Sequence, residues 1–273
     1  MFQDISPQVF DNHYDQRRAP IGTDYVVLYH NREAILHDGT LPRYQEVAAK
    51  WQLPETAYTY LFSVDQTAFY LVAEQVAEDA AYQYVETRRF TQLTPNWVAF
   101  AAATAAHLGW CYETNQFCGR CGHRMEQDGK ERALRCPQCG QLIFPKISPA
   151  IIVGVTDGDS ILMTKFLTGY NRYSLISGYA EIGETLEATI AREVHEEVGL
   201  SVHNLRYYGS QPWAPSESLL VGFFADLNQE KSIRLEHDEL AKAQWFKRDE
   251  IPHDDTTLSL TWKMIEAFRN HEV

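Results

Sequence analysis

The chain has 273 residues, of which 45% are hydrophobic, and a formal net charge of −13. This length suits two or three modules, and the hydrophobic content is enough for packed cores. The negative net charge argues against a dedicated binder of long nucleic acids, because such binding depends on a cationic surface. It does not exclude a small anionic substrate, since metal ions can supply positive charge locally.

The chain shows no sign of membrane or secretory targeting. Its start lacks a charged segment followed by an apolar stretch, which is the pattern of a signal peptide. The most apolar run, residues 97–110, is alanine-rich, contains His107 and is too short to span a bilayer. We therefore expect a packed helix there, no membrane contact and a cytoplasmic protein.

Residues 1–112 are expected to form an N-terminal α+β domain with a linking helix. Short β-like segments alternate with polar or turn-prone stretches, at residues 25–29, 34–37, 58–64 and 68–72. No catalytic motif lies there, so the region is predicted to be a scaffold or to cover the substrate. Thr94 and Pro95 predict the start of a helix that runs to about residue 112, as a cap and a first-turn proline.

Four of the five cysteines predict a zinc ribbon over residues 113–146. Cys118 and Cys121 form one pair, Cys136 and Cys139 form the other, and fourteen residues separate the pairs. This spacing is typical of a tetrahedral four-thiolate zinc site. Two disulfides are the alternative, which the lack of a secretory signal disfavours. Four thiolates leave no position for water, so we expect structural zinc; the fifth, Cys111, is expected to be a buried free thiol.

Residues 147–273 are predicted to form the catalytic domain. Strands are expected at residues 150–155 and 160–164, around a turn at 157–159, and at 173–177, 205–210, 219–226 and 243–246. A closing helix is expected over residues 258–268. Strands combined with a buried helix and a terminal helix indicate a mixed sheet between helices.

Residues 178–200 carry the chemistry of this domain. Leu186, Ile190, Val194 and Val198 recur every four residues, which predicts a helix with one buried face. Glu193, Glu196 and Glu197 then project together from another face, and Gly199 is expected to end the helix. Clustered like charges repel, so cations are expected between them, and Mg²⁺ suits carboxylates and phosphates. A solvated acidic helix is the alternative interpretation.

The spacing around this helix resembles the Nudix box. Gly178 is followed by five residues and Glu184, then by seven residues and the run Arg192-Glu193-Val194-His195-Glu196-Glu197-Val198-Gly199-Leu200. The resemblance implies hydrolysis of a nucleoside diphosphate linked to another group, with a divalent metal. It also implies an α/β/α sandwich with a mixed sheet, preceded by the zinc ribbon and an N-terminal α+β Nudix-like scaffold domain.

A second group of residues indicates which family within the Nudix enzymes the chain resembles. Ser210-Gln211-Pro212-Trp213, together with the cysteine pairs and the segment 144–149, resembles the NADH pyrophosphatase family, whose members also remove NAD caps from RNA. The similarity runs in register from about residue 85 to the C-terminus. It implies NADH or NAD⁺ as substrate, catalytic Mg²⁺ or Mn²⁺, structural Zn²⁺ and a homodimer.

The resemblance assigns roles to individual residues. It implies that Glu193, Glu196, Glu197 and Glu239 bind the catalytic metal, with a backbone carbonyl near Ser177 or Gly178 as a further ligand. Phe144 and Tyr179 match aromatic residues that enclose the nicotinamide ring. Further substrate contacts are implied for Gln211, Pro212, Trp213, Ser218, Arg89, Glu131 and Thr261. The alternatives are ordinary packing for the aromatic residues and solvated charges for Arg89 and Glu131.

The chain also departs from the family pattern. The family's loop usually continues after S-Q-P-W as P-F-P-x-S-L, whereas this chain has Ala214-Pro215-Ser216-Glu217-Ser218-Leu219. Two prolines and an aromatic residue are missing from their usual places, and a carboxylate is added. The family often has S-I-A where Ser259-Leu260-Thr261 stands, and tyrosine often stands at the position of Phe144. These differences bear on the choice of substrate and leave the glutamate set intact.

The expected reaction is metal-assisted hydrolysis of the central pyrophosphate, giving nicotinamide mononucleotide and AMP. One glutamate accepts the proton of water, with Glu196 and Glu239 as candidates. Other Nudix substrates are ADP-ribose, diadenosine polyphosphates and the 5′ cap of RNA. A nucleotide-binding module without turnover is the alternative from another class. The sequence does not choose between free dinucleotide and NAD-capped RNA.

Overall fold

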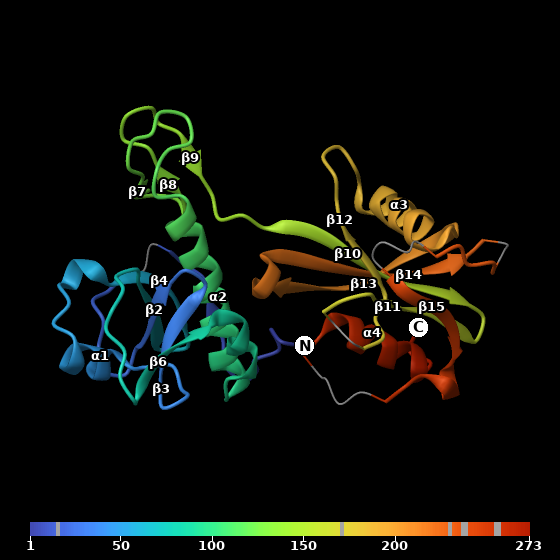
Figure 1. The fold of residues 1–273 in the computed structure, drawn as a ribbon, viewed down its shortest axis with the longest axis horizontal. Helices are drawn as coiled ribbons and strands as arrows, with labels where there is room; N and C mark the ends of the chain where they lie inside the picture. The colour runs from blue at the N-terminus through green and yellow to red at the C-terminus, as the bar shows by residue number, and fades with distance from the viewer. Residues whose placement is uncertain (15–16, 170–171, 229–230, 236–239, 254–257) are drawn as a thin grey trace. The chain divides into compact units, whose positions relative to one another are not determined.

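The computed structural model describes residues 1–14, 17–169, 172–228, 231–235, 240–253 and 258–273. The chain separates into two compact units (Figure 1). One unit contains Gln3–Lys146 and Ala214–Glu217, and the other contains Met1–Phe2, Ile147–Trp213 and Ser218–Val273. The predicted division into three domains, with a separate ribbon, stays a prediction.

The first unit is built on a six-stranded sheet in the order β1-β4-β5-β2-β3-β6. β2 and β5 pair in parallel at its centre, and the other neighbours are antiparallel. The strands are β1 (Phe10–Asp11), β2 (Tyr25–His30), β3 (Glu33–His37), β4 (Thr59–Val64), β5 (Thr67–Val72) and β6 (Tyr82–Glu86). The four predicted β segments are confirmed as β2 to β5, whereas β1 and β6 were not predicted.

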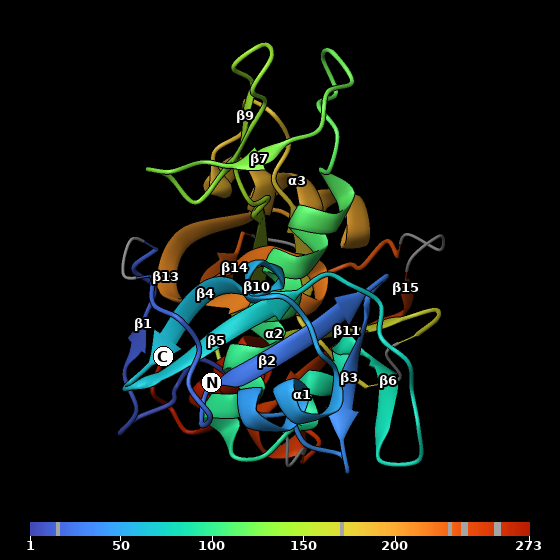
Figure 2. The same cartoon turned by 90° about the vertical axis from the view of Figure 1, so that its left-hand side faces the viewer.

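Helices cover both faces of this sheet. Helix α1 (Tyr44–Lys50) places Val47 in a core with residues of β2 and β3, and helix α2 (Asn96–Thr114) lies against the other face (Figure 2). The predicted helix at residues 94–112 is confirmed as α2, but the predicted cap is wrong, because Pro95 stands at the N-cap position and no described side chain caps the helix. Short 3₁₀ turns occur at η1 (Glu55–Ala57) and η2 (Thr87–Gln92). The sequence analysis missed α1 because only one of its residues, Val47, is buried.

The cysteine region of this unit forms a small three-stranded sheet, β7-β8-β9. Its strands are β7 (Glu126–Gln127), β8 (Leu134–Arg135) and β9 (Leu142–Ile143). Each strand has two residues and buries little apolar surface, so the sheet supplies only a small hydrophobic core. A structure of this size usually needs a metal or a disulfide for stability.

The second unit contains a mixed sheet in the order β13-β14-β10-β11-β15. β10 pairs in parallel with β14 along one edge, while β12 and β11 pair antiparallel with successive parts of its other edge. The strands are β10 (Ser148–Asp157), β11 (Ser160–Phe166), β12 (Ile176–Tyr179), β13 (Val202–Trp213), β14 (Ser218–Leu227) and β15 (Leu240–Lys247). β10 therefore supports β12 and β14 from opposite sides.

Two helices complete the layers of this unit. Helix α3 (Leu186–Val198) covers one face of the sheet and α4 (Leu260–Arg269) covers the other (Figure 1). Ile190, Val194 and Val198 are fully buried in the α3 core, and Leu260 and Met264 are fully buried in the α4 core. The turns η3 (Ala214–Ser216) and η4 (Arg248–Glu250) follow β13 and β15. The predicted α/β/α sandwich with a mixed sheet is confirmed.

Three local predictions need correction or comment. The third strand lies at Ile176–Tyr179 instead of 173–177, because only Ser174 of the earlier residues makes a bridge, to Thr164. Gln211–Trp213, expected in a loop, is the end of β13 and pairs with Ser218–Leu220 of β14. Within the described ranges, no helix is both long and apolar enough to cross a membrane.

Candidate active site and zinc centre

Helix α3 presents the glutamates of the predicted site. Its first turn is capped by Thr185, whose hydroxyl accepts a hydrogen bond from the backbone N–H of Ala188 at 3.2 Å. Gly199 ends the helix in the left-handed conformation, with φ of 69°, as predicted. The apolar face packs onto the sheet, so the rotation of the helix is set by its core and the opposite side chains point away from it.

Arg192 connects the carboxylates around this helix. Its Nε and Nη2 donate to the two oxygens of Glu184 at 2.8 and 3.0 Å, in a bidentate pair. Its Nη1 donates to Glu193 Oε1 at 2.7 Å and to Glu196 Oε2 at 2.9 Å. Nη2 also donates to the carbonyl of Tyr179 at 2.9 Å. One guanidinium thus joins β12, the loop before α3 and α3 itself.

The hydrogen bonds of this network lower the pKa of Glu184. The side-chain hydrogen bond from Arg192 is the main cause, with a backbone N–H from Glu181, and together they lower the pKa of Glu184 from 4.5 to about 2. The same carboxylate raises the pKa of the Arg192 guanidinium above its usual range. Both groups are therefore charged at neutral pH, which agrees with an orienting role for Arg192.

Gly178 is required by the close approach of Glu193. A Cβ atom at position 178 would lie 2.0 Å from Cδ of Glu193 and 2.1 Å from Oε1, which is far inside contact distance. Only glycine leaves room for a carboxylate so close to the backbone of β12. The backbone at Gly178 and the Glu193 carboxylate are therefore neighbours.

The three predicted metal ligands on α3 differ in exposure. The Glu196 side chain is 56% exposed, Glu193 is largely covered, and Glu197 is only 5% exposed. Burial of a carboxylate is costly unless opposite charge or hydrogen bonds compensate it. Carboxylates beside a backbone carbonyl are the hard oxygen donors that Mg²⁺ and Mn²⁺ prefer, so these residues fit such an ion. Glu239, the fourth predicted ligand, lies outside the described residues.

The S-Q-P-W segment has a structural role in β13. Gln211 is fully buried, its Nε2 donates to the carbonyl of Leu258 at 2.7 Å, and its Oε1 accepts from the N–H of Leu260 at 2.8 Å. The amide thus joins β13 to the start of α4. Pro212 is exposed and Trp213 is half-buried, with its ring centroid 5.9 Å from that of Phe2 in an edge-to-face arrangement. Sequence reasoning did not detect this bridge, because α4 lies far along the chain.

Tyr179 and Ser218 are brought together by the pairing of β12 and β14 with β10. The Tyr179 hydroxyl lies 3.3 Å from Ser218 Oγ, while the Tyr179 residue is 52% exposed. Thr261, in the first turn of α4, is half-buried in the same unit. The predicted substrate contacts of this unit thus include the exposed ring of Tyr179 and the buried hydroxyl of Ser218.

The remaining predicted contacts belong to the other unit. Phe144 is 56% exposed, and Arg89 in η2 is exposed. Glu131 is also exposed, and its N–H donates to Asp128, as does the N–H of Lys130. Their substrate roles stay predictions. Sequence reasoning missed Arg32, which pairs with Glu217 at 3.0 Å; the added carboxylate at 217 was the only signal.

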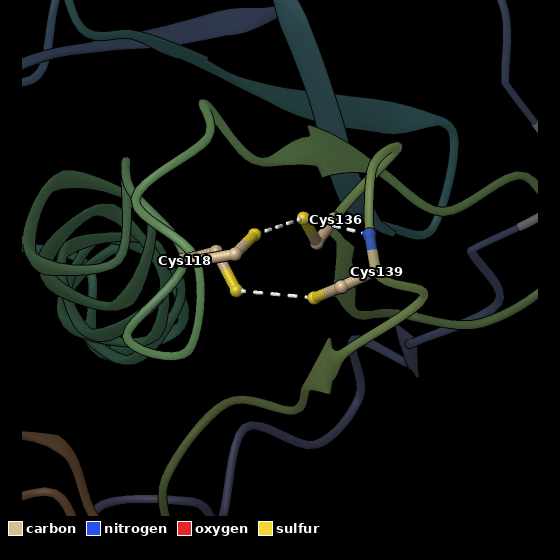
Figure 3. Close-up of side chains that lie close together, drawn as sticks. Cys118, Cys136 and Cys139 are labelled. Atoms are coloured by element: carbon tan, nitrogen blue, oxygen red, sulfur yellow. Dashed lines mark hydrogen bonds between the residues drawn. The ribbon is translucent and has the colours of Figure 1, made fainter.

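The four ribbon cysteines converge on one point (Figure 3). Their sulfur atoms lie within 4.8 Å of one another, with Cys118 Sγ 3.6 Å from Cys139 and Cys121 Sγ 3.4 Å from Cys136. Four sulfurs at 2.3 Å from a tetrahedral zinc are about 3.8 Å apart, so the set fits Zn²⁺. Gly122 and Gly140, both with φ of 74°, donate to the carbonyls of Cys118 and Cys136 and close the two knuckles.

Comparison with known proteins identifies two domains of known families in the chain. The NUDIX domain family matches residues 146–268, and the NADH pyrophosphatase zinc ribbon domain matches residues 113–144. The NAD-capped RNA hydrolase NudC of Haemophilus influenzae strain PittEE is 38% identical over 203 residues, covering 72% of this chain and 75% of that protein. The protein of the same description from Pseudomonas aeruginosa strain LESB58 is 40% identical over 167 residues, covering 60% and 59%.

A solved structure supports the fold. A NUDIX hydrolase from Nitrosomonas europaea aligns with a TM-score of 0.50 and 19% identity, over 57% of this chain and 92% of that one. A mixed sheet between two helices, with a glutamate-bearing helix entered through a glycine, defines the class of Nudix hydrolases. Within that class the chain belongs to the family that carries the NADH pyrophosphatase zinc ribbon and includes the NudC proteins.

We expect one tightly bound zinc per chain at the four cysteines. Cys136→Ser should lose the metal and lower the melting temperature, because ribbon zinc drives local folding. Cys111→Ala is the control, because Cys111 lies outside the cluster. Elemental analysis of purified protein measures the zinc. Full zinc content in Cys136→Ser, or none in the unmodified protein, would contradict the assignment.

The low pKa of Glu184 predicts a pH dependence of stability. Since its pKa is lower in the folded chain, Glu184 contributes stability above about pH 4.5, and this is lost as the pH falls towards 2. Glu184→Gln should therefore lower the melting temperature at pH 7 more than at pH 3. Thermal melts of both proteins across this pH range measure the difference. A constant difference would show that Glu184 does not titrate with the low pKa.

Proposed function

We propose that this protein hydrolyses the central pyrophosphate of NADH and NAD⁺ and that of the NAD cap on RNA. The products are nicotinamide mononucleotide and either AMP or RNA with a 5′-monophosphate. The observation that carries the proposal is the Arg192-centred arrangement of Glu193, Glu196 and Glu197 beside Gly178. The relatives named as NAD-capped RNA hydrolases support the choice of substrate.

The three glutamates of α3 would hold catalytic Mg²⁺ or Mn²⁺, with the backbone near Ser177 and Gly178 as a further oxygen donor. Such ions, when bound, neutralise phosphate charge and make water a better nucleophile. Glu193 is positioned by Arg192 and by the space at Gly178, and Glu197 is held in the buried layer of the helix. The protein thus contributes fixed negative charges that need no rearrangement when phosphate arrives.

Glu196 is the described residue best placed to accept the proton of the attacking water. It is the most exposed of the three glutamates, so solvent reaches its carboxylate. Arg192 fixes it with a single hydrogen bond to Oε2, which leaves other lone pairs available. Glu239 is the second candidate for this role.

Tyr179 is proposed to recognise the nicotinamide. Its ring is half exposed at the end of β12, one residue after the glycine that borders Glu193. Phe144 also exposes its ring, and we propose that it provides a second stacking surface. Ser218 would orient Tyr179 through the contact between their hydroxyl groups. We further propose that the enzyme acts in the cytoplasm as a homodimer, as the family resemblance implies.

A different nucleoside diphosphate, such as ADP-ribose, is the second candidate substrate. The observation that favours it is the turn after Trp213, which lacks two prolines and an aromatic residue of the family pattern. Turnover of NADH, NAD⁺, ADP-ribose and NAD-capped RNA under identical conditions decides between the substrates. Product release with a divalent cation would also exclude a module that only binds nucleotide.

We expect Glu197→Gln to keep the fold and to lower kcat/KM for NADH by at least about a hundredfold, because an amide is a poor ligand for a hard cation. Glu187→Gln is the matched control, because Glu187 lies on the same helix and is exposed. Steady-state kinetics with Mg²⁺ or Mn²⁺ measure the effect. Glu197 would not be a metal ligand if Glu197→Gln retained more than about a tenth of the activity. Such a change corresponds to a loss of less than about 1.4 kcal/mol of transition-state stabilisation.

Tyr179→Ala should lower kcat/KM for NADH by roughly several-fold to tens-fold, since it removes both stacking and apolar burial. ADP-ribose lacks the nicotinamide, so its hydrolysis should change much less. Tyr179→Phe keeps the ring and should behave like the unmodified protein, and Tyr207→Ala controls for loss of another exposed tyrosine. Equal losses for the two substrates would show that Tyr179 supports the backbone at Gly178 instead of binding the nicotinamide.

A further inference from the structure

The turn between β13 and β14 is where this chain departs from its family, and a charged contact holds it. Glu217 accepts a hydrogen bond from Arg32 Nη2 at 3.0 Å, and its side chain is only 14% exposed. The guanidinium of Arg32 lies 3.7 Å from the ring centroid of Trp110 on α2, which is a cation–π arrangement. Arg32 is therefore fixed on two sides, by a ring and by a carboxylate.

Both partners of this contact adopt an uncommon backbone conformation. Asn31 and Arg32 form the two-residue turn between β2 and β3, with φ of 49° and 64°, and Glu217 has φ of 56°. The left-handed region is disfavoured for a residue with a Cβ. Such conformations persist where surrounding contacts determine them. Around Arg32 these contacts include those with Glu217 and Trp110, a hydrogen bond from its N–H to the hydroxyl of Tyr29, and one from the N–H of Thr87 to its carbonyl.

The turn borders a cavity. Ala214, Pro215 and Glu217 line a cavity of about 480 Å³ together with Arg32 and Trp110. Alanine and serine stand at positions where the family pattern has prolines, so the backbone of the turn is less restricted before it folds. The contacts of the turn include the Arg32 pair and the hydrogen bond from Glu217 N–H to the carbonyl of Ala214 at 3.1 Å.

We propose that Arg32 and Glu217 are a positioning pair that fixes the turn Ala214–Glu217, which joins Trp213 to Ser218 in the sequence. Trp213 and Ser218 are the residues through which this segment would meet the substrate, so the part that concerns substrate rests on the proposed function. The pair replaces, by charge and cation–π contact, the stiffness that proline supplies in the family pattern. It touches no reacting atom and acts on substrate affinity.

Charge reversal tests the pair. Arg32→Glu and Glu217→Arg should each raise KM for NADH by roughly three- to tenfold with kcat changed less than about twofold, because partly exposed ion pairs and cation–π contacts are individually modest. The double variant Arg32→Glu/Glu217→Arg should return KM to within about twofold of the unmodified value. Glu217→Gln removes the charge without altering the β2–β3 turn, and it should raise KM in the same direction. Arg206→Glu, in an exposed pair with Asp226 on the same two strands, is the control.

Hydrogen exchange tests the same pair without substrate. The amides of Ser216 and Glu217 should exchange roughly three- to tenfold faster in Arg32→Glu and Glu217→Gln, and should recover in the double variant. The proposal would be overturned if amide exchange and KM were both unchanged in the single variants. It would also be overturned if the double variant folded but kept the raised KM and the fast exchange of the single variants. A failure of the unmodified protein to hydrolyse NADH would refute the proposed function separately, since exchange reports the pair directly.

Discussion

The candidate site depends on the hydrogen bonds that the guanidinium of Arg192 makes. Its planar fork bonds Glu184 through two nitrogens and still reaches Glu193, Glu196 and the carbonyl of Tyr179. A lysine has a single charged nitrogen and could not hold these groups at once. The positive charge also offsets the repulsion among neighbouring glutamates, which would otherwise disfavour the helix. The glutamate face of α3 is therefore organised by one residue of its own helix.

The sheet gives this arrangement a rigid base. β10 is paired on both sides, so β12, with Gly178 and Tyr179, and β14, with Ser218, are fixed through their backbones. The buried Gln211 extends the same support to the start of α4. Residues that would bind substrate thus stand at strand ends and helix starts, where packing and main-chain hydrogen bonds limit their movement.

Different forces stabilise the other functional parts. The ribbon has strands of two residues and depends on four thiolates gathered to hold zinc. The turn at Ala214–Glu217 borders a cavity, and its Glu217 pairs with Arg32, which lies over the ring of Trp110. Hydrophobic burial dominates only in the layers of α3 and α4. Changes in pH, chelation and salt are therefore expected to affect separate parts of the molecule.

The sequence by itself determined the features that depend on local spacing. The glutamates and buried face of α3, the cap at Gly199, the cysteine pairs and most strands follow from periodicities and fixed intervals along the chain. Only the tertiary structure decided that Glu193 needs the space at Gly178, that Gln211 bonds α4, and that Arg32 meets Glu217. These contacts join residues 15 to 185 positions apart, and no local pattern encodes such distances because they arise when strands pair and helices pack.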